Sequence, residues 1–190
     1  MVSWADKPIL PFVTAEEWDD YLGGDPDTGG VRLKMRKKAA VDPGITYAEA
    51  LDVALCHGWI DGQAGAFDEQ FSLQAFTPRR RASPWSQVNR EHVARLIAEG
   101  RMRPAGLAEI ERAKADGRWD AAYRQKGVEV PEDLRVALEA EPVAAEFFAA
   151  LGSQKRFAFL FRLQQLKRAE SRARRIQEYV ALLTEGRTLT

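Results

Sequence analysis

The chain has 190 residues, with 28 lysines and arginines balanced by 28 aspartates and glutamates, and 45% of its residues are apolar. This composition is typical of a water-soluble globular chain and excludes intrinsic disorder, which combines low hydrophobicity with high net charge. The single cysteine, Cys56, excludes an internal disulfide, and with only two histidines it argues against a His/Cys metal cluster. We therefore expect no metal and no cofactor, in one domain or one domain with a small appendage.

The N-terminal segment, residues 1–22, turns acidic without a basic start or a long apolar run, which is not the pattern of a secretion signal. No run of about 18 apolar residues is present, so we expect no membrane insertion. With one cysteine, these features predict a cytoplasmic protein. The balanced net charge hides a gradient, because residues 1–30 carry 1 basic and 7 acidic residues, whereas residues 151–190 carry 9 basic and 3 acidic. This gradient is compatible with internal docking, self-association or an anionic partner.

Two capping boxes predict the first two helices. Thr14 precedes Glu17 and Thr46 precedes Glu49, a spacing at which each side chain satisfies a free backbone N–H group at the start of a helix. The residues that follow predict helices over 14–22 and 46–57.

Three short runs predict strands. Apolar and cationic residues alternate over 31–36, and two aromatic-flanked runs over 59–63 and 71–76 are typical of a hairpin with a long turn. Together the three runs predict a small antiparallel sheet.

The remainder of the chain shows only helical signals. Ser83 followed by Pro84 predicts the start of a helix that ends at Glu99. Further helices are expected over 104–116, 131–140, 142–151, 153–168 and 171–184, with a short turn around 119–125. A glycine and a proline break the pattern near 126–131, so we predict an α+β domain over 1–127 and an all-helical C-terminal subdomain over 128–190 that packs on the first.

The segment 76–89 holds the most informative candidate site. Arg79, Arg80 and Arg81 precede the predicted helix start at Ser83, where free N–H groups and the helix dipole favour an anion. Trp85 offers a stacking face for a base or an aromatic ligand. The predicted ligand-binding residues are Trp59, Asp61, Arg79, Arg80, Arg81, Ser83, Trp85 and Asn89. The alternative is that the arginines pair with Asp61, Asp68 and Glu69 while Trp85 belongs to the core.

Catalysis has fewer signals. Cys56 and His57 are adjacent, so on a helix their side chains point about 100° apart and form no direct thiolate–imidazole pair. Asp61 could act as a general base if the arginines held an anionic substrate, so an enzyme of this kind remains an alternative. We predict no catalytic residue.

The C-terminal helices carry a cationic stripe formed by Arg168, Arg172 and Arg175 at helical spacing, which could follow a phosphate backbone. The alternative is a solvated face that pairs with Glu170 and Glu178, or that docks on the acidic N-terminal segment. An exposed Phe or Leu patch over 143–166 would instead favour a protein partner or a homo-oligomer.

Five ordered motifs resemble the YdeI/OmpD-associated family of bacterial proteins: ALCHGWIDGQ (54–63), FTPRR (76–80), SPWSQVN (83–89), GRMRPAGL (100–107) and KRAESRARRI (167–176). The resemblance extends from Trp18 to Gly186. It implies an α+β N-terminal part, a helical tail and a role in bacteriocin protection, stress or the envelope, but no particular reaction. The family usually has a proline between the tail helices where this sequence has Ala169, so no proline enforces a break there.

These observations predict a non-catalytic cytosolic binding protein that recognises an anionic ligand, either a phosphorylated small molecule or nucleic acid, through Arg79, Arg80 and Arg81. The alternatives are an enzyme with Asp61 as base and a protein–protein interaction module built from the C-terminal helices.

Overall fold

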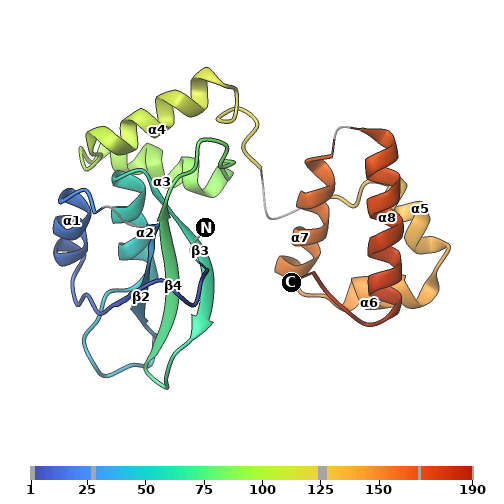
Figure 1. The fold of residues 1–190 in the computed structure, drawn as a ribbon, viewed down its shortest axis with the longest axis horizontal. Helices are drawn as coiled ribbons and strands as arrows, with labels where there is room; N and C mark the ends of the chain where they lie inside the picture. The colour runs from blue at the N-terminus through green and yellow to red at the C-terminus, as the bar shows by residue number, and fades with distance from the viewer. Residues whose placement is uncertain (1–2, 27–28, 124–127, 167, 190) are drawn as a thin grey trace. The chain divides into compact units, whose positions relative to one another are not determined.

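The computed structural model describes residues 3–26, 29–123, 128–166 and 168–189. The chain divides into two compact units, Met1–Tyr123 and Arg124–Thr190, each built around its own hydrophobic core (Figure 1). Every strand that the structure describes lies in the first unit, and the second is helical, so the α+β class is confirmed. Packing of the second unit on the first stays a prediction.

The first unit contains a four-stranded sheet in the order β1-β2-β4-β3, formed by β1 (Ile9–Leu10), β2 (Val31–Arg36), β3 (Trp59–Ala66) and β4 (Phe71–Pro78). The predicted hairpin of β3 and β4 is confirmed, and β4 also pairs antiparallel with β2, so these three strands form the predicted antiparallel sheet. β1 was not predicted, and it runs parallel to β2, so the sheet is mixed rather than purely antiparallel. Two residues are too short to show the alternation by which strands are recognised.

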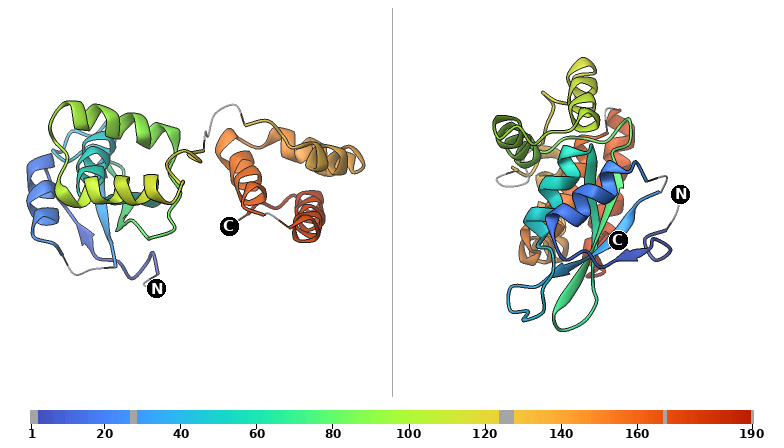
Figure 2. Two further views of the ribbon diagram at one scale, coloured as in Figure 1. Left: turned by 90° about the horizontal axis from the view of Figure 1, so that it is seen from above. Right: turned by 90° about the vertical axis from the view of Figure 1, so that its left-hand side faces the viewer.

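Helices α1 (Ala15–Gly23) and α2 (Tyr47–Cys56) cover one face of this sheet (Figures 1 and 2). Both predicted capping boxes are present, at Thr14 and Thr46. Trp18 is fully buried between the helices and the sheet, where its ring contacts Trp59 and Phe76. The Trp18 Nε1–H group donates to the carbonyl of Ala50 at 3.1 Å, so this large core residue leaves no polar group unsatisfied.

Helix α3 (Gln87–Ala98) begins later than the sequence predicts, because its N-cap is Ser86 rather than Ser83. The chain before it is held by Tyr123, whose N–H donates to the Trp85 carbonyl at 3.0 Å and whose carbonyl accepts from the Gln87 N–H at 2.8 Å. This pairing keeps the segment extended and prevents helix formation from Ser83. The Ser83 Oγ instead accepts from the backbone N–H of Arg80 at 3.0 Å, closing a turn.

Helix α4 (Pro104–Ala115) completes the first unit and crosses the end of α2. Gly106 makes this crossing possible, because a Cβ atom at this position would lie 2.2 Å from the carbonyl oxygen of Cys56. The absence of a side chain therefore sets how closely α4 approaches α2.

The second unit consists of α5 (Glu132–Glu139), α6 (Pro142–Ala150), α7 (Ser153–Gln164) and α8 (Ala169–Thr184). Its core contains Leu134, Phe148, Phe159, Leu163 and Tyr179. Helix α7 ends four residues earlier than predicted, and α8 starts at Ala169, so the two helices are separate although no proline stands between them. Over the ranges described, no helix combines the length and the apolar character needed to cross a membrane.

Candidate functional site

Arg79 is the centre of the predicted site, and it is buried rather than open to water. It follows β4 directly, and only 6% of its surface is exposed. Its guanidinium carbon lies 3.7 Å from the centroid of the Trp85 ring, and its Nη1–H group donates to the Pro84 carbonyl at 3.3 Å. Its Nε and Nη2 atoms have no hydrogen-bond partner among the described residues. Burial lowers the pKa of Arg79 to about 10, so the side chain still carries its charge at neutral pH.

Arg118 brings a second guanidinium to the same place from the segment after α4. Its Nη1–H group donates to the Ser83 carbonyl at 2.8 Å, next to the Pro84 carbonyl that Arg79 contacts. Its Nε–H group donates to Asp116 at 2.8 Å, while its Nη2 atom is buried and finds no partner in the described chain. The two cations therefore lie against one two-residue stretch of backbone.

Glu109 supplies a carboxylate close to these cations. Its Oε1 atom accepts from Arg112, whereas its Oε2 atom is buried and has no partner within the described ranges. A Cβ atom at Gly58 would lie 2.9 Å from the Cγ of Glu109, and the Gly58 carbonyl accepts from the Arg79 backbone N–H at 3.0 Å. After burial itself, the Glu109 charge is the largest influence on the pKa of Arg79, which it raises. No ion pair joins the two in the described structure.

We call Arg79, Trp85, Glu109 and Arg118 the arginine site. The sequence predicted two of its members, Arg79 and Trp85, and missed the other two. Nothing in the sequence around Glu109 or Arg118 links them to Arg79, because the tertiary fold alone brings α4 and the segment after it against residues 83–85.

The other predicted ligand-binding residues have different environments. Arg80 and Arg81 are exposed, and their guanidinium groups have no hydrogen bond or ion pair with the residues described. Asp61 is half-buried and accepts from the Tyr47 hydroxyl at 2.9 Å. Trp59 packs edge-on against Trp18 in the core. Asn89 lies in the first turn of α3, where its backbone N–H donates to Ser86.

The alternative, in which the arginine run pairs with carboxylates, is not seen among the described residues. Within the described structure, no ion pair joins Arg79, Arg80 or Arg81 to Asp61, Asp68 or Glu69. The predicted helix N-terminus at Ser83 is wrong, however, because α3 begins at Gln87 with Ser86 as its N-cap, three residues later than predicted.

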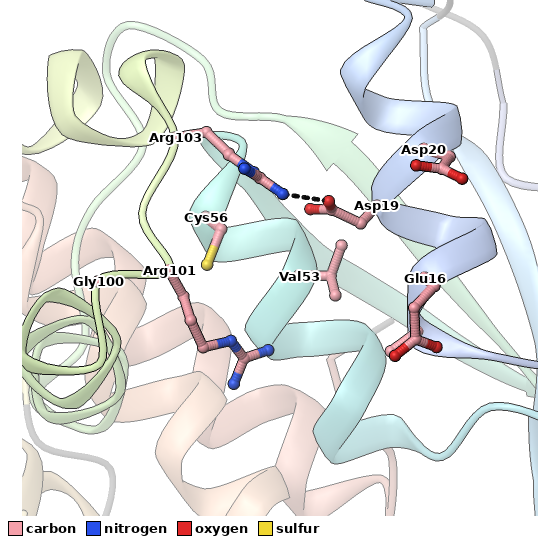
Figure 3. Close-up of a pocket in the computed structure, with 9 residues that line it drawn as sticks. Glu16, Asp19, Asp20, Val53, Cys56, Gly100, Arg101 and Arg103 are labelled. Atoms are coloured by element: carbon pink, nitrogen blue, oxygen red, sulfur yellow. Dashed lines mark hydrogen bonds and ion pairs between the residues drawn. The ribbon is translucent and has the colours of Figure 1, made fainter.

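A hollow of about 380 Å³ lies between α1, α2 and the segment after α3, away from the arginine site (Figure 3). Acidic residues of α1 line one side and two arginines line the other, with Val53 and Cys56 of α2 between them. The lining residues are Ala15, Glu16, Asp19, Asp20, Val53, Cys56, Gly100, Arg101 and Arg103. An adjoining hollow of about 670 Å³ shares Asp19, Asp20 and Arg103.

Asp19 joins the elements around this hollow. One of its oxygens lies 2.7 Å from His57 Nε2, and the other accepts from Arg103. Although burial raises the pKa of Asp19, hydrogen bonds from Arg103 and His57 outweigh it and lower the pKa below its usual value. These charges satisfy one another, which is typical of a structural ion-pair network.

Cys56 is 2% exposed, and burial raises the pKa of its thiol to about 11. A thiol with this pKa is protonated at neutral pH and is a weak nucleophile. The described residues also contain no group of three or more His, Cys, Asp or Glu side chains that could hold a metal ion.

Two of the three arginines of the predicted C-terminal stripe form ion pairs within the second unit. Arg172 binds the Asp133 carboxylate and donates to the Leu163 carbonyl at 2.8 Å. Arg175 lies 2.8 Å from Glu178, and Arg168 is exposed at the start of α8. These contacts favour the alternative of a paired, solvated face over a phosphate-binding stripe.

The apolar side chains over 143–166, which would favour a protein-binding module if exposed, are buried only in part: Phe147, Phe157 and Phe161 are half-buried, and Val143 is 60% exposed. Phe148, Phe159, Leu160 and Leu163 are at most 5% exposed. They form the core of the second unit, so these side chains are not available to a partner.

Comparison with known proteins identifies the family. Residues 10–109 match the family described as a domain of unknown function (DUF8412), and residues 127–186 match the family described as bacteriocin-protection, YdeI or OmpD-associated. No curated protein and no solved structure matches the chain. The first match covers more than half of the chain, and the second confirms the resemblance over its C-terminal part. The chain therefore belongs to the DUF8412 family, and residues 127–186 of its second unit are similar to the YdeI or OmpD-associated family that the KRAESRARRI motif (167–176) resembles.

Proposed function

We propose that the Met1–Tyr123 unit is a binding module for a small anionic ligand, with Arg79 as its anchor. One observation carries the proposal: Arg79 is 94% buried, yet its Nε and Nη2 atoms have no acceptor in the described chain. Leaving a buried charged donor unsatisfied costs about 1–3 kcal/mol or more, so water or a ligand has to supply the acceptors. An anion supplies both the acceptors and the counter-charge.

The guanidinium geometry suits this role. Nε and Nη2 lie on one edge of the planar group and can bind two oxygens of a carboxylate or phosphate side by side. The Trp85 ring, 3.7 Å from the guanidinium carbon, holds the group in place, so little conformational freedom is lost on binding. Exposed Arg80 and Arg81, adjacent in the chain, would raise the local concentration of anions and speed their arrival.

Catalysis by Asp61 receives less support. Tyr47 donates a hydrogen bond to the Asp61 carboxylate, and burial, followed by the Asp61 charge, raises the pKa of Tyr47. This hydroxyl therefore stays protonated and occupies one Asp61 oxygen. A cytoplasmic location, a protein partner or homo-oligomer, and a role in bacteriocin protection or stress stay predictions.

The test is calorimetric titration of the full chain with inorganic phosphate and with a phosphomonoester. Arg79→Gln removes the guanidinium edge that offers Nε and Nη2 together. It should weaken binding at least about tenfold, which corresponds to one lost charge-assisted contact. Arg79→Lys keeps the charge but loses the two-point contact, so it should rescue binding only in part.

Arg32→Gln is the matched control. Arg32 also lies against a tryptophan, with its guanidinium carbon 4.7 Å from the Trp4 ring centroid, but its nitrogens donate to the carbonyls of Ala5 and Lys7. Its loss should leave anion binding unchanged. Equal binding by wild type and by folded Arg79→Gln, or no saturable binding of either anion by the wild type, would contradict the proposal.

A further inference from the structure

We infer that the arginine site selects a phosphate group that still carries a proton, as free phosphate or as a phosphomonoester, over sulfate and over phosphodiesters. This inference rests on the proposed anion-binding function and names the ligand chemistry. It arises from one feature that the arginines do not explain, which is the buried and unpartnered Oε2 atom of Glu109.

The polar atoms without partners at the site are not all donors. Four are donors, namely Nε and Nη2 of Arg79, Nη2 of Arg118 and the indole Nε1 of Trp85, and one is a carboxylate oxygen, Oε2 of Glu109. All five atoms are buried and find no acceptor or donor among the described residues. A ligand that satisfies them must accept several hydrogen bonds and donate one.

Glu109 is held beside Arg79 by the backbone. Its Cγ occupies the space over Gly58, where a Cβ atom would approach it to 2.9 Å, and the Gly58 carbonyl accepts from the Arg79 N–H. Arg112 already binds the Oε1 atom of Glu109, and Asp116 already binds Nε of Arg118. With Nη1 of Arg118 bound to the Ser83 carbonyl, the atoms that remain for a ligand are Oε2 of Glu109 and Nη2 of Arg118.

Common anions differ in whether they can donate a hydrogen bond to the Oε2 atom of Glu109. Sulfate and phosphodiesters carry no acidic proton near neutral pH, so they would place bare anionic oxygens against the Glu109 carboxylate. That contact is repulsive and leaves Oε2 without a donor. A phosphomonoester, whose second ionisation lies near pH 6, keeps a P–OH group in about a tenth of its molecules at pH 7. This P–OH group can donate to Oε2 while the other oxygens accept from the arginines.

The expected discrimination is large. Sites built to bind a hydroxyl group reject analogues that lack it by about 10⁴–10⁵-fold. For a monoester, the small protonated fraction reduces this by about tenfold, whereas inorganic phosphate keeps a P–OH group in every ion near neutral pH. We therefore expect phosphate and phosphomonoesters to bind on the order of 100-fold or more tightly than sulfate. The same reasoning disfavours nucleic acid at this site, because its backbone consists of phosphodiesters.

The test is calorimetric titration of the full chain at pH 7 with inorganic phosphate, methyl phosphate, sulfate, dimethyl phosphate and a short single-stranded oligonucleotide. Phosphate or methyl phosphate should bind, and the other three should bind at least about 100-fold more weakly. Binding of inorganic phosphate alone would identify the free ion as the ligand, whereas binding of both would identify the shared monoester chemistry.

Glu109→Gln tests the role of the carboxylate. The amide is nearly isosteric and offers an N–H donor, so the variant should bind sulfate more tightly and phosphate more weakly, which removes the preference. Glu111→Gln is the control on the same helix, because Glu111 is 70% exposed at its side chain and pairs with Lys114. If Glu109→Gln does not fold, the inference is still tested by whether the wild type binds phosphate more tightly than sulfate.

Three outcomes distinguish a failure of the inferred phosphate selectivity from a failure of the proposed anion-binding function. Equal binding of phosphate and sulfate overturns the inference and leaves the anion-binding function intact. Tight binding of dimethyl phosphate or of the oligonucleotide also overturns it, in favour of a nucleic-acid ligand. No binding of any anion overturns the proposed function and the inference together.

Discussion

The guanidinium carbon of Arg79 lies 3.7 Å from the centroid of the Trp85 ring, and both side chains are more than nine-tenths buried. Trp85→Ala removes this support and leaves a large cavity, so the free energy of unfolding should fall by about 3–5 kcal/mol. Urea denaturation followed by circular dichroism measures the change. Val88→Ala, at a 51% exposed position nearby, should shift it by no more than about 0.5 kcal/mol. Similar losses in the two variants would contradict the buried position of Trp85.

Gly106 and Gly23 should respond to alanine in opposite directions. Alanine in a helix is usually more stable than glycine by about 1 kcal/mol. At Gly106, however, the added methyl group would meet the Cys56 carbonyl oxygen at 2.2 Å and push α4 away from α2, so the free energy of unfolding should fall by about 1–3 kcal/mol. Gly23 is the last residue of α1, and a Cβ atom added there would meet no neighbouring atom within 4 Å. Gly23→Ala should therefore be neutral or stabilising. Thermal melting of the two variants compares them directly, and a stabilised Gly106→Ala would show that the helices are not packed this closely.

Asp19 should make the first unit sensitive to acid. Arg103 and His57 lower the pKa of its carboxylate in the folded chain below the usual value of 3.8. A lowered folded pKa stabilises the fold above the unfolded pKa, and this stabilisation is lost as the pH falls through the folded pKa. The advantage of wild type over Asp19→Asn in free energy of unfolding should therefore be full near pH 5 and shrink toward pH 3.

Urea titrations at a series of pH values measure this difference. Asp20→Asn is the control, because Asp20 is exposed on the same helix and has no hydrogen bond or ion pair with the described residues. A constant difference between wild type and Asp19→Asn from pH 5 to pH 3 would show that the ion pairs do not stabilise the fold.

Arg172 should matter for the stability of the second unit and Arg174 should not. Arg172 connects α8 to Asp133 of α5 and to the carbonyl of Leu163 in α7, and its side chain is 23% exposed. Arg172→Ala should lower the free energy of unfolding by about 1.5–3 kcal/mol, the range for hydrogen bonds to charged groups. Arg174, with a 75% exposed side chain and a 3.9 Å contact to Glu178, should change it by less than about 0.5 kcal/mol when replaced by alanine. Chemical denaturation distinguishes the two, and equal effects would argue that Arg172 is free to bind a phosphate backbone.

Local sequence patterns predicted most of the elements because the interactions that form them lie within a few residues. Thr14 and Glu17 cap α1 reciprocally, and Thr46 and Glu49 do the same for α2, so these helix starts could be read directly. The alternation in β2 and the hairpin of β3 and β4 depend on similarly short-range patterns.

The candidate site could be predicted only in part. Arg79 and Trp85 are close in sequence and were identified together, and the alternative that Trp85 belongs to the core is confirmed. The burial of Arg79 was not predicted, because an arginine run next to a helix start normally faces water. Glu109 and Arg118 join them through α4 and the segment after it, and no local pattern records that contact.

The sequence by itself determined the α+β class, the capped helices and the hairpin, because hydrophobic periodicity and capping are local properties of the chain. The tertiary structure decided where α3 begins, since Tyr123 pairs with Trp85 and Gln87 and a Ser-Pro start signal is weaker than these two backbone hydrogen bonds. It also decided that Arg79 is a buried cation and that Glu109 lies beside it. The burial of Arg79 and the identity of the charged residues around it depend on segments that are distant in sequence. Only the folded chain brings those segments together.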